Sequence, residues 1–267
     1  MTHTSPISRY LNVQNAYFPS FSTDGQSIIF IADITGVPQV WRVPARPTAH
    51  PYWPEQLTFE SERVLGVWPA PNDGSSPNCL TNDRLLFSRD AGGNEKAQFF
   101  LLDPQSGDTQ ALTAGHEQAM HSFGCWAHNG NAFFFSANRR NPALFDVYRY
   151  DLATGQTDMI WQHDEPGYLY DFAVTRDARR LAFVRAAASF SHDLFELDLQ
   201  SGDVRRLSPA DKQARYGPLA YTPGGRTLFL ITDLESDFLH IRRLEPASKT
   251  WESVVTPNWD VEWMALS

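Results

Sequence analysis

The sequence predicts an all-β fold, a β-propeller built from four-stranded antiparallel blades. The first observation is internal repetition: a unit of short apolar runs separated by turn residues, first seen over 19–44, recurs four times downstream. The second is the period of these copies, roughly 46 to 59 residues, which is typical of propeller blades. The third is composition, because 13% aromatic residues with 18 Pro and 16 Gly favour many short strands and turns over helices.

Each repeat is expected to contribute four strands. In the first repeat, Asp24 and Gly25 form the turn between strands one and two, since Gly tolerates a positive φ and Asp can bond its own backbone. The second strand runs through Phe30 to Asp33, a pair that recurs as Phe87 with Asp90, Phe135 with Asn138, Phe183 with Ala186 and Leu230 with Asp233. Trp41 in the third strand is matched by Phe100, Tyr148, Phe195 and Ile241. The fourth strands contain Leu57, Leu112, Ile160, Leu207 and Val254.

The whole chain, 1–267, is interpreted as one propeller domain. Its five repeats cover about 16–59, 64–113, 121–162, 168–208 and 216–257, and 259–267 reads as the first strand of a sixth. Each propeller blade packs its face on the next, so an unclosed ring leaves apolar faces in water. The chain therefore closes a five-bladed ring with its two ends, or is part of something longer, or self-associates through its terminal repeats and buries Trp259 and Trp263.

Charge and hydropathy exclude several partners. The formal net charge of −9 argues against nucleic acid and anionic membranes, which need clustered Lys and Arg. No apolar run approaches the 18 or so residues of a membrane span, and the first ten residues lack an apolar leader core. We therefore expect a cytoplasmic location.

The sequence shows no pattern for bond-making chemistry. A nucleophile elbow needs Gly two residues before and after the serine, and no serine meets this spacing: Ser76 has only Gly74 and Ser122 only Gly124. The histidines show no HExxH pattern, and Cys79 and Cys125 have no CxxC companion. Asp233, Glu235 and Asp237 alternate like the acidic residues at the start of a calcium loop. The Gly and the Glu that such a loop requires further on are missing. We expect no catalytic residue, no metal and no cofactor in this chain.

One group of loops is the candidate binding surface. The connections between second and third strands all emerge at one end of a propeller, and recognition tends to reside in loops on a rigid scaffold. They read DITGVPQ, RDAGGNEKAQ, NRRNPALFD, RAAASFSHD and DLESDFLH. The residues predicted to contact a peptide or a partner domain are Arg89, Asp90, Asn94, Glu95, Arg139 and Arg140.

Five stretches carry a resemblance to a known family. They are DITGVPQVW (33–41), PEQLTF (54–59), SRDAGGNEKAQFFLLD (88–103), SANRRNPALFDVYRYDL (136–152) and the terminal WDVEWMALS. Together they resemble the N-terminal propeller of the prolyl oligopeptidase family of serine peptidases, on its acylaminoacyl-peptidase side. The resemblance implies a propeller, usually of seven blades, that sits over an α/β-hydrolase domain and restricts entry to short peptides. It also implies that the catalytic serine, aspartate and histidine belong to that following domain, which we expect to be missing here.

Two functions follow as expectations. The first is a non-catalytic propeller that gates or selects peptides for a serine peptidase, with the α/β-hydrolase domain as partner. The second is a stand-alone interaction module whose channel or loop face binds a protein or a small ligand. A sugar-acid lyase built on a propeller would need a metal-binding histidine cluster, and the sequence shows none.

Overall fold

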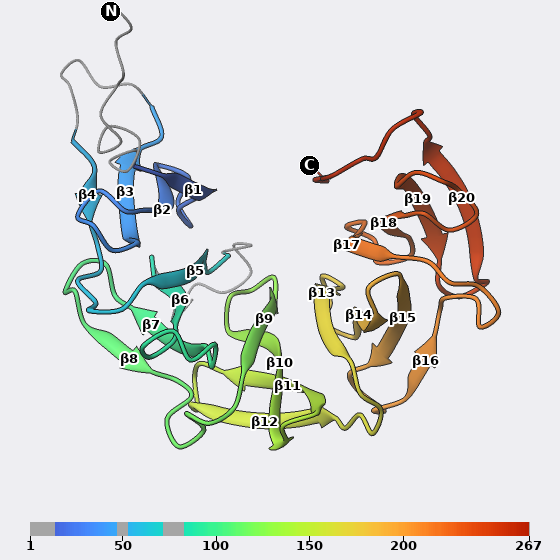
Figure 1. Ribbon diagram of the computed structural model, residues 1–267, viewed down its shortest axis with the longest axis horizontal. Coiled ribbons are helices and arrows are strands. Elements are labelled where there is room, and N and C mark those ends of the chain that lie inside the picture. The colour runs from blue at the N-terminus through green and yellow to red at the C-terminus, as the bar shows by residue number, and fades with distance from the viewer. Residues whose placement is uncertain (1–13, 47–52, 72–82, 267) are drawn as a thin grey trace, which may run out of the picture. The chain divides into compact units, whose positions relative to one another are not determined.

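The computed structural model describes residues 14–46, 53–71 and 83–266, and within these ranges every regular element is a β-strand (Figure 1). The strands form five sheets, each of four strands paired in chain order and antiparallel. Each sheet is one blade. The prediction of five four-stranded antiparallel blades is confirmed.

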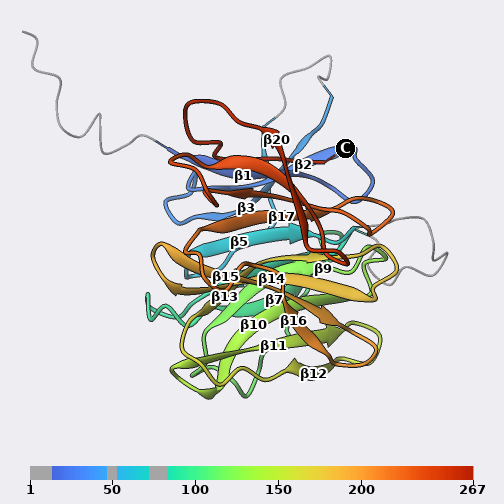
Figure 2. The same cartoon turned by 90° about the vertical axis from the view of Figure 1, so that its right-hand side faces the viewer.

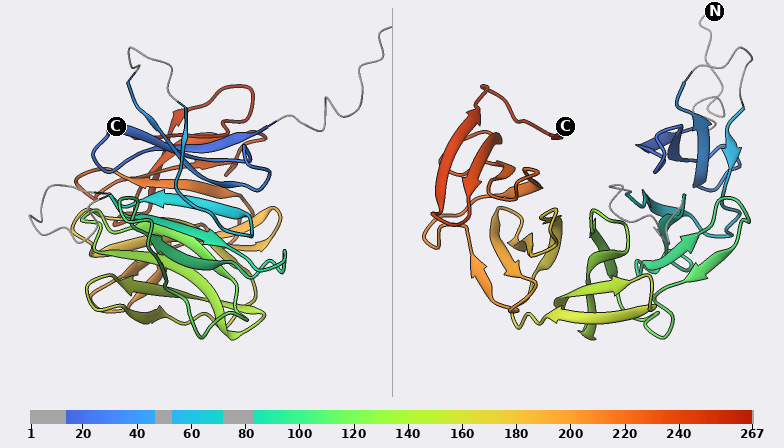
Figure 3. Two further views of the ribbon diagram at one scale, coloured as in Figure 1. Left: turned by 90° about the vertical axis from the view of Figure 1, so that its left-hand side faces the viewer. Right: turned by 180° about the vertical axis from the view of Figure 1, so that it is seen from behind.

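Blades 1 and 2 belong to one compact unit, seen from two sides in Figures 2 and 3. Blade 1 consists of β1 (Ala16–Phe21), β2 (Ser27–Ala32), β3 (Gln39–Pro44) and β4 (Glu55–Gln56). Blade 2 consists of β5 (Val64–Pro69), β6 (Leu85–Arg89), β7 (Gln98–Leu102) and β8 (Thr109–Ala111). Their shared core contains Ile31, Val40, Val67 and Phe87.

Blades 3 to 5 form the second compact unit. Blade 3 consists of β9 (His121–Trp126), β10 (Ala132–Asn141), β11 (Leu144–Asp151) and β12 (Gln156–Trp161). Blade 4 consists of β13 (Tyr168–Val174), β14 (Arg180–Ala188), β15 (Ser191–Asp198) and β16 (Val204–Arg206). Blade 5 consists of β17 (Tyr216–Tyr221), β18 (Leu228–Thr232), β19 (His240–Glu245) and β20 (Thr250–Val255).

Strand alternation connects the blades of this second unit. Successive side chains of a strand point to opposite faces of the sheet, so one strand serves two cores. In β14, Phe183 belongs to the core that blade 4 shares with blade 3, whereas Val184 belongs to the core shared with blade 5. Both side chains are fully buried. Blade 4 is therefore held by apolar packing on both of its faces.

The first strands of these three blades approach one another at glycine positions. A Cβ atom on Gly124 of β9 would lie 2.7 Å from Cδ2 of Phe172 in β13, and one on Gly217 of β17 would collide with the carboxylate of Asp171. Both glycines lie where the pairing of a first strand with its second strand shifts register. Their missing side chains are what allow β13 to lie this close to both neighbours.

The turns between first and second strands share one backbone geometry. In blade 1, the amide of Gly25 donates to the carbonyl of Ser22 at 2.8 Å, and Gly25 has a φ of 70°. Blade 4 makes the same 2.8 Å bond from Ala178 to Thr175, although Ala178 is not a glycine and still takes a φ of 51°. The strands impose this turn on whatever residue occupies the position.

One alignment from the sequence is wrong by one residue. In blade 5 the residue opposite Leu230 is Arg242, not Ile241, which instead pairs with Ile231. In the other blades the predicted aromatic does lie opposite the second-strand residue, as Trp41 does opposite Phe30. The β18–β19 connection sets this register, and its turn, in which the amide of Ser236 donates to the carbonyl of Asp233 at 3.0 Å, is not marked by a Gly or Pro in the sequence.

The segment after β20 begins as a further first strand would. The amide of Val261 donates to the carbonyl of Leu239 at 2.8 Å, just as Val64, the first residue of β5, donates to Pro38 in front of β3 at 2.8 Å. Residues 259–266 form no regular strand, so the predicted first strand of a sixth repeat is not seen in the described residues.

Cys125 lies in β9 as a free cysteine, and burial raises the pKa of its thiol. Cys79 lies outside the described residues. Over those same residues, no helix has the length and apolar character needed to cross a lipid bilayer.

Candidate functional site

The candidate site lies at the end of each blade where strands one and three begin and strands two and four end, here called the loop end. In blades 1, 3 and 5, a polar residue in the last part of the second strand or just past it ties this end to the residue in front of the first strand. The carboxylate of Asp33 accepts from the amide of Asn15, Asn138 accepts from Met120 and Asp233 accepts from Arg215, all at 2.7 Å. These bonds explain why the sequence repeats Asp or Asn at this position.

Blade 2 departs from this pattern at Asp90. The side chain is 1% exposed, its Oδ2 accepts from the amide of Glu95 at 3.0 Å, and its Oδ1 has no hydrogen-bond partner. The Oδ1 of Asn94 accepts from the amide of Lys96 at 2.9 Å. Arg89 pairs with Glu60 at 2.9 Å, and its guanidinium lies 4.4 Å from the ring centre of Phe100. Of the four predicted residues in blade 2, Asn94 and Glu95 are exposed, Arg89 is half-buried and Asp90 is buried.

Arg140 in blade 3 bonds residues within and just after its own blade. Its Nη2 lies 3.0 Å from Oδ1 of Asp146 and 2.6 Å from the carbonyl oxygen of His163, and it also pairs with Asp164 at 3.2 Å. Asp146 is fully buried and accepts from the amide of His163 at 2.9 Å. These contacts hold the end of blade 3 together, and the two carboxylates largely neutralise the charge that Arg140 could offer to a ligand.

Arg139 is placed differently from its neighbour. Its Nε donates to Nε2 of His121 at 3.0 Å, and its guanidinium lies 5.2 Å and 4.9 Å from the ring centres of Phe135 and Tyr148. Its Nη2 is buried without a hydrogen-bond partner, and burial lowers the pKa of the guanidinium. Among the described residues no carboxylate lies within 4.0 Å of Arg139.

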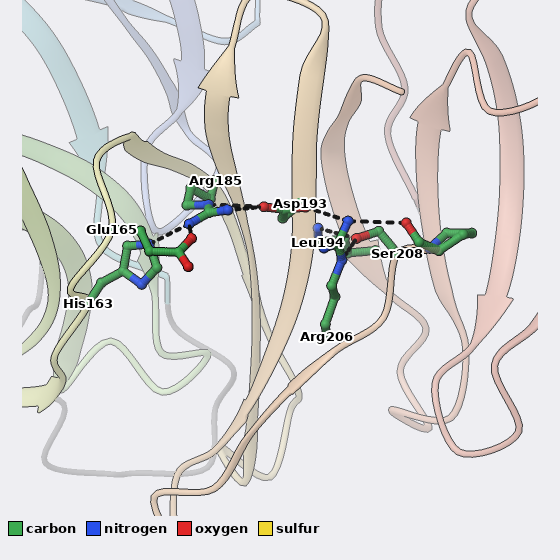
Figure 4. A network of polar contacts seen from close by, with 8 residues as sticks. His163, Glu165, Arg185, Asp193, Leu194, Arg206 and Ser208 are labelled. Carbon is green, nitrogen blue, oxygen red and sulfur yellow. Dashed lines mark hydrogen bonds and ion pairs between the residues drawn. The ribbon is translucent and has the colours of Figure 1, made fainter. Parts of the chain in front are cut away.

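Blade 4 contains a buried ionic network that sequence reasoning missed (Figure 4). The Nε of Arg185 donates to Oδ2 of Asp193 at 3.0 Å, and its Nη1 contacts Nε2 of His163 at 3.0 Å and the carboxylate of Glu165. The other oxygen of Asp193 lies 2.6 Å from Nη2 of Arg206. The side chains of Arg185 and Asp193 are only 11% and 9% exposed.

A signal for this network existed in the sequence. Arg185 interrupts the apolar run of β14, and Asp193 lies opposite it on β15. Opposite charges at facing positions of a predicted hairpin indicate an ion pair. The network also sets the state of His163: burial and the nearby Arg185 lower the pKa of its imidazole, and the bond from Arg185 requires an unprotonated Nε2.

Blade 5 completes the loop end of this unit. Arg215 pairs with Asp233 at 2.8 Å, and Lys212 contacts Glu235. Nearby Phe190, at the tip of the β14–β15 hairpin, is 71% exposed, and the guanidinium of Arg215 lies 5.7 Å from its ring centre. Asp233 and Glu235, two of the acidic residues considered for calcium, are thus bound to cations of the chain itself.

The opposite end of the same unit carries a groove of about 430 Å³ between the first turns of blades 3, 4 and 5. Asn129, Arg176 and Gly224 line it, one from each blade. Arg176 has an exposed side chain with no ion-pair partner among the described residues. Arg176 is thus a second guanidinium of this unit, after Arg139, without a carboxylate partner in the described part of the chain.

Each end of this unit presents a guanidinium without a carboxylate partner among the described residues, Arg139 at the loop end and Arg176 in the groove. In the described part of the chain, no group of three or more His, Cys, Asp or Glu is arranged to hold a metal ion. Of the two serines with one suitably spaced glycine, Ser122 lies within β9 and not in a strand-to-helix turn, and Ser76 lies outside the described residues. The arrangement can hold charged and apolar groups of a ligand.

The sequence matches a known family over more than half of its length. Residues 77–263 match the sequence profile of the family described as "Prolyl oligopeptidase, N-terminal beta-propeller domain". Dipeptidyl aminopeptidase BIII from Pseudoxanthomonas mexicana is 25% identical over 154 residues, which cover 56% of this chain and 20% of that protein. The chain thus spans about a fifth of the length of this curated relative.

Solved structures resemble the fold. A prolyl endopeptidase superposes with a TM-score of 0.66 at 12% identity, covering 92% of this chain and 37% of the other. TolB from Acinetobacter baumannii superposes with a TM-score of 0.60 at 15% identity, covering 92% of this chain and 56% of the other.

Proposed function

Because the chain belongs to the prolyl oligopeptidase N-terminal β-propeller family, we propose that it is a non-catalytic propeller that selects or gates peptides for a serine peptidase domain. The match over 77–263 is the observation that carries this proposal. Members of such a family need a separate domain for the chemistry, and the length of the curated relative leaves room for one. The proposed partner is an α/β-hydrolase domain.

The chemistry of the residues supports a non-catalytic role. No serine in the sequence lies between glycines at the spacing of a nucleophile elbow. His163, a buried histidine at the loop end, accepts a bond from Arg185, and the serine of this network, Ser208, bonds Arg206 and not the imidazole. We therefore expect the purified chain to leave peptides and acyl esters uncleaved.

The loop end of blades 3 to 5 is the surface we assign to the peptide or the partner domain. It combines the exposed ring of Phe190 with the unneutralised guanidinium of Arg139. Its remaining charges bond one another and so hold these two groups on a stable base. Rigid presentation reduces the entropy lost on binding.

Charge reversal tests this assignment. Fluorescence anisotropy of a dye-labelled alanine-rich octapeptide measures peptide binding by the full chain. We expect Arg139→Glu and Arg140→Glu to weaken binding by about ten-fold, because each places a negative charge on the loop end. Lys249→Glu, at an exposed turn after β19, is the matched control and should leave binding unchanged. Equal effects at all three positions would contradict the assignment.

An interaction module is the second candidate, and one observation favours it. Trp259 and Trp263 are 67% and 75% exposed in the segment after β20, and exposed aromatic side chains are enriched in protein interfaces. Capture experiments separate the two candidates. A gate should bind a prolyl oligopeptidase-family hydrolase domain produced as a separate protein, whereas a module should not.

A further inference from the structure

We propose that Arg139 binds a carboxylate group of a peptide at the loop end of blade 3. This inference rests on the proposed function, because it takes a peptide as the ligand. It adds the chemical group that is recognised and the side chain that recognises it.

The pairing of neighbouring cations singles out Arg139. Six other Lys and Arg side chains at the loop end of blades 3 to 5 lie within 4.0 Å of a carboxylate. They are Arg140, Arg185, Arg206, Lys212, Arg215 and Arg242. Among the described residues, Arg139 has only a neutral acceptor, the ring of His121. It is the guanidinium at this end whose charge is left for an outside group.

The geometry around Arg139 orients it for such a group. His121 takes the Nε hydrogen at 3.0 Å, and the rings of Phe135 and Tyr148 hold the guanidinium plane from their faces. The Nη edge therefore keeps its donors, and Nη2 is buried without an acceptor. A buried donor without an acceptor is destabilising, and a carboxylate that bonds the exposed part of this half-buried guanidinium would offset that cost.

The surroundings favour a carboxylate over a more highly charged anion. Burial disfavours the cationic form of Arg139, so an incoming negative charge recovers lost stability. Asp146 and Asp164 lie on the same side of blade 3 around Arg140, and the net charge of the chain is −9. These negative charges repel a phosphate dianion or a nucleic acid more than they repel a monoanion.

Peptides supply a carboxylate from two sources, the chain terminus and a Glu or Asp side chain. Isothermal titration calorimetry with three probes distinguishes them: acetyl-tetraalanine as free acid, the same peptide as C-terminal amide, and the amide with one Ala replaced by Glu. We expect the amide to bind about ten- to a hundred-fold more weakly than the free acid if the terminus is recognised. If a side chain is recognised, the Glu-containing amide regains that affinity.

Variants locate the effect. Arg139→Gln should lower the affinity for every carboxylate probe to the affinity measured for the plain amide. Arg176→Gln removes a guanidinium that also lacks a carboxylate partner, from the groove at the opposite end, and should leave all three affinities unchanged. Arg139→Lys keeps the charge but loses the planar fork, so an intermediate affinity is expected. Thermal melts of all variants check folding, and Arg139→Lys serves if Arg139→Gln does not fold.

The outcomes separate this inference from the proposed function. Equal binding of all three probes to the unaltered chain would overturn the role of Arg139 and leave peptide gating intact. If carboxylate-dependent binding survives in Arg139→Gln but is lost in Arg176→Gln, the site lies in the groove. That result would also overturn the role of Arg139. Failure of every probe to bind would overturn both.

Discussion

At the scale of single residues, buried charges fix the loop end of blade 4. Asp193 accepts from both Arg185 and Arg206, so it neutralises two cations at once. Removing one member of a buried pair leaves an uncompensated charge, which costs about 3–5 kcal/mol. We expect Asp193→Ala to lower the free energy of unfolding by about 3 kcal/mol in urea denaturation.

A surface pair provides the control for this prediction. Arg243 and Glu252 bond across β19 and β20 with side chains 47% and 50% exposed. Exposed ion pairs contribute at most about 1 kcal/mol to the free energy of unfolding, so Glu252→Ala should lower that free energy by less than this amount. Similar losses in the two variants would show that the blade 4 network is solvated.

Asp171 predicts a pH dependence of stability. Burial raises the pKa of its carboxyl group from 3.8 to about 6, so the folded state favours the protonated form. The folded state therefore loses stability as the pH rises from about 4 to about 6 and stays at that level above, an effect of about 2–3 kcal/mol. The Asp171→Asn side chain cannot ionise. Denaturation curves should therefore show that the free energy of unfolding of this variant, relative to the unaltered chain, rises by about this much between pH 4 and pH 7. A difference that does not vary with pH would contradict the prediction.

At the scale of elements, the turn of blade 4 carries backbone strain. Ala178 holds a φ of 51° where the equivalent residue of blade 1 is Gly25. A left-handed conformation costs a residue with a Cβ atom about 1–2 kcal/mol. Ala178→Gly should therefore raise the free energy of unfolding by about 1 kcal/mol, as measured by denaturation, while Ala153→Gly in the β11–β12 turn should not.

The strands and turns were predictable from sequence because they follow local rules. Asp24 with Gly25 marks a turn, and the repeated Phe and Asp of the second strand mark its buried run and its end. Contacts between elements were not predictable in the same way. Whether Arg139 or Arg140 meets a carboxylate depends on Asp146, six residues beyond Arg140 and brought near by the pairing of β10 with β11. The residue opposite Leu230 likewise depends on the path of a connection rather than on composition.

At the scale of the whole molecule, the segment after β20 predicts self-association. Trp259 and Trp263 expose apolar rings beside a backbone edge that already bonds Leu239. We expect sedimentation velocity to show a species that grows with protein concentration, and Trp263→Ser to reduce it because apolar burial drives association. Phe190→Ser, which removes an equally exposed ring from the loop end, should leave it unchanged. A monomer at all concentrations would favour the alternative of a five-bladed closed ring.

The alternation of Phe183 and Val184 between two cores also limits how such a gene can change in length. A one-residue deletion inside β14 would exchange the two faces beyond that point and present each core with the wrong side chains. Viable insertions and deletions are therefore confined to the hairpin tips. Related sequences should differ in loop length freely while their strand lengths stay nearly constant.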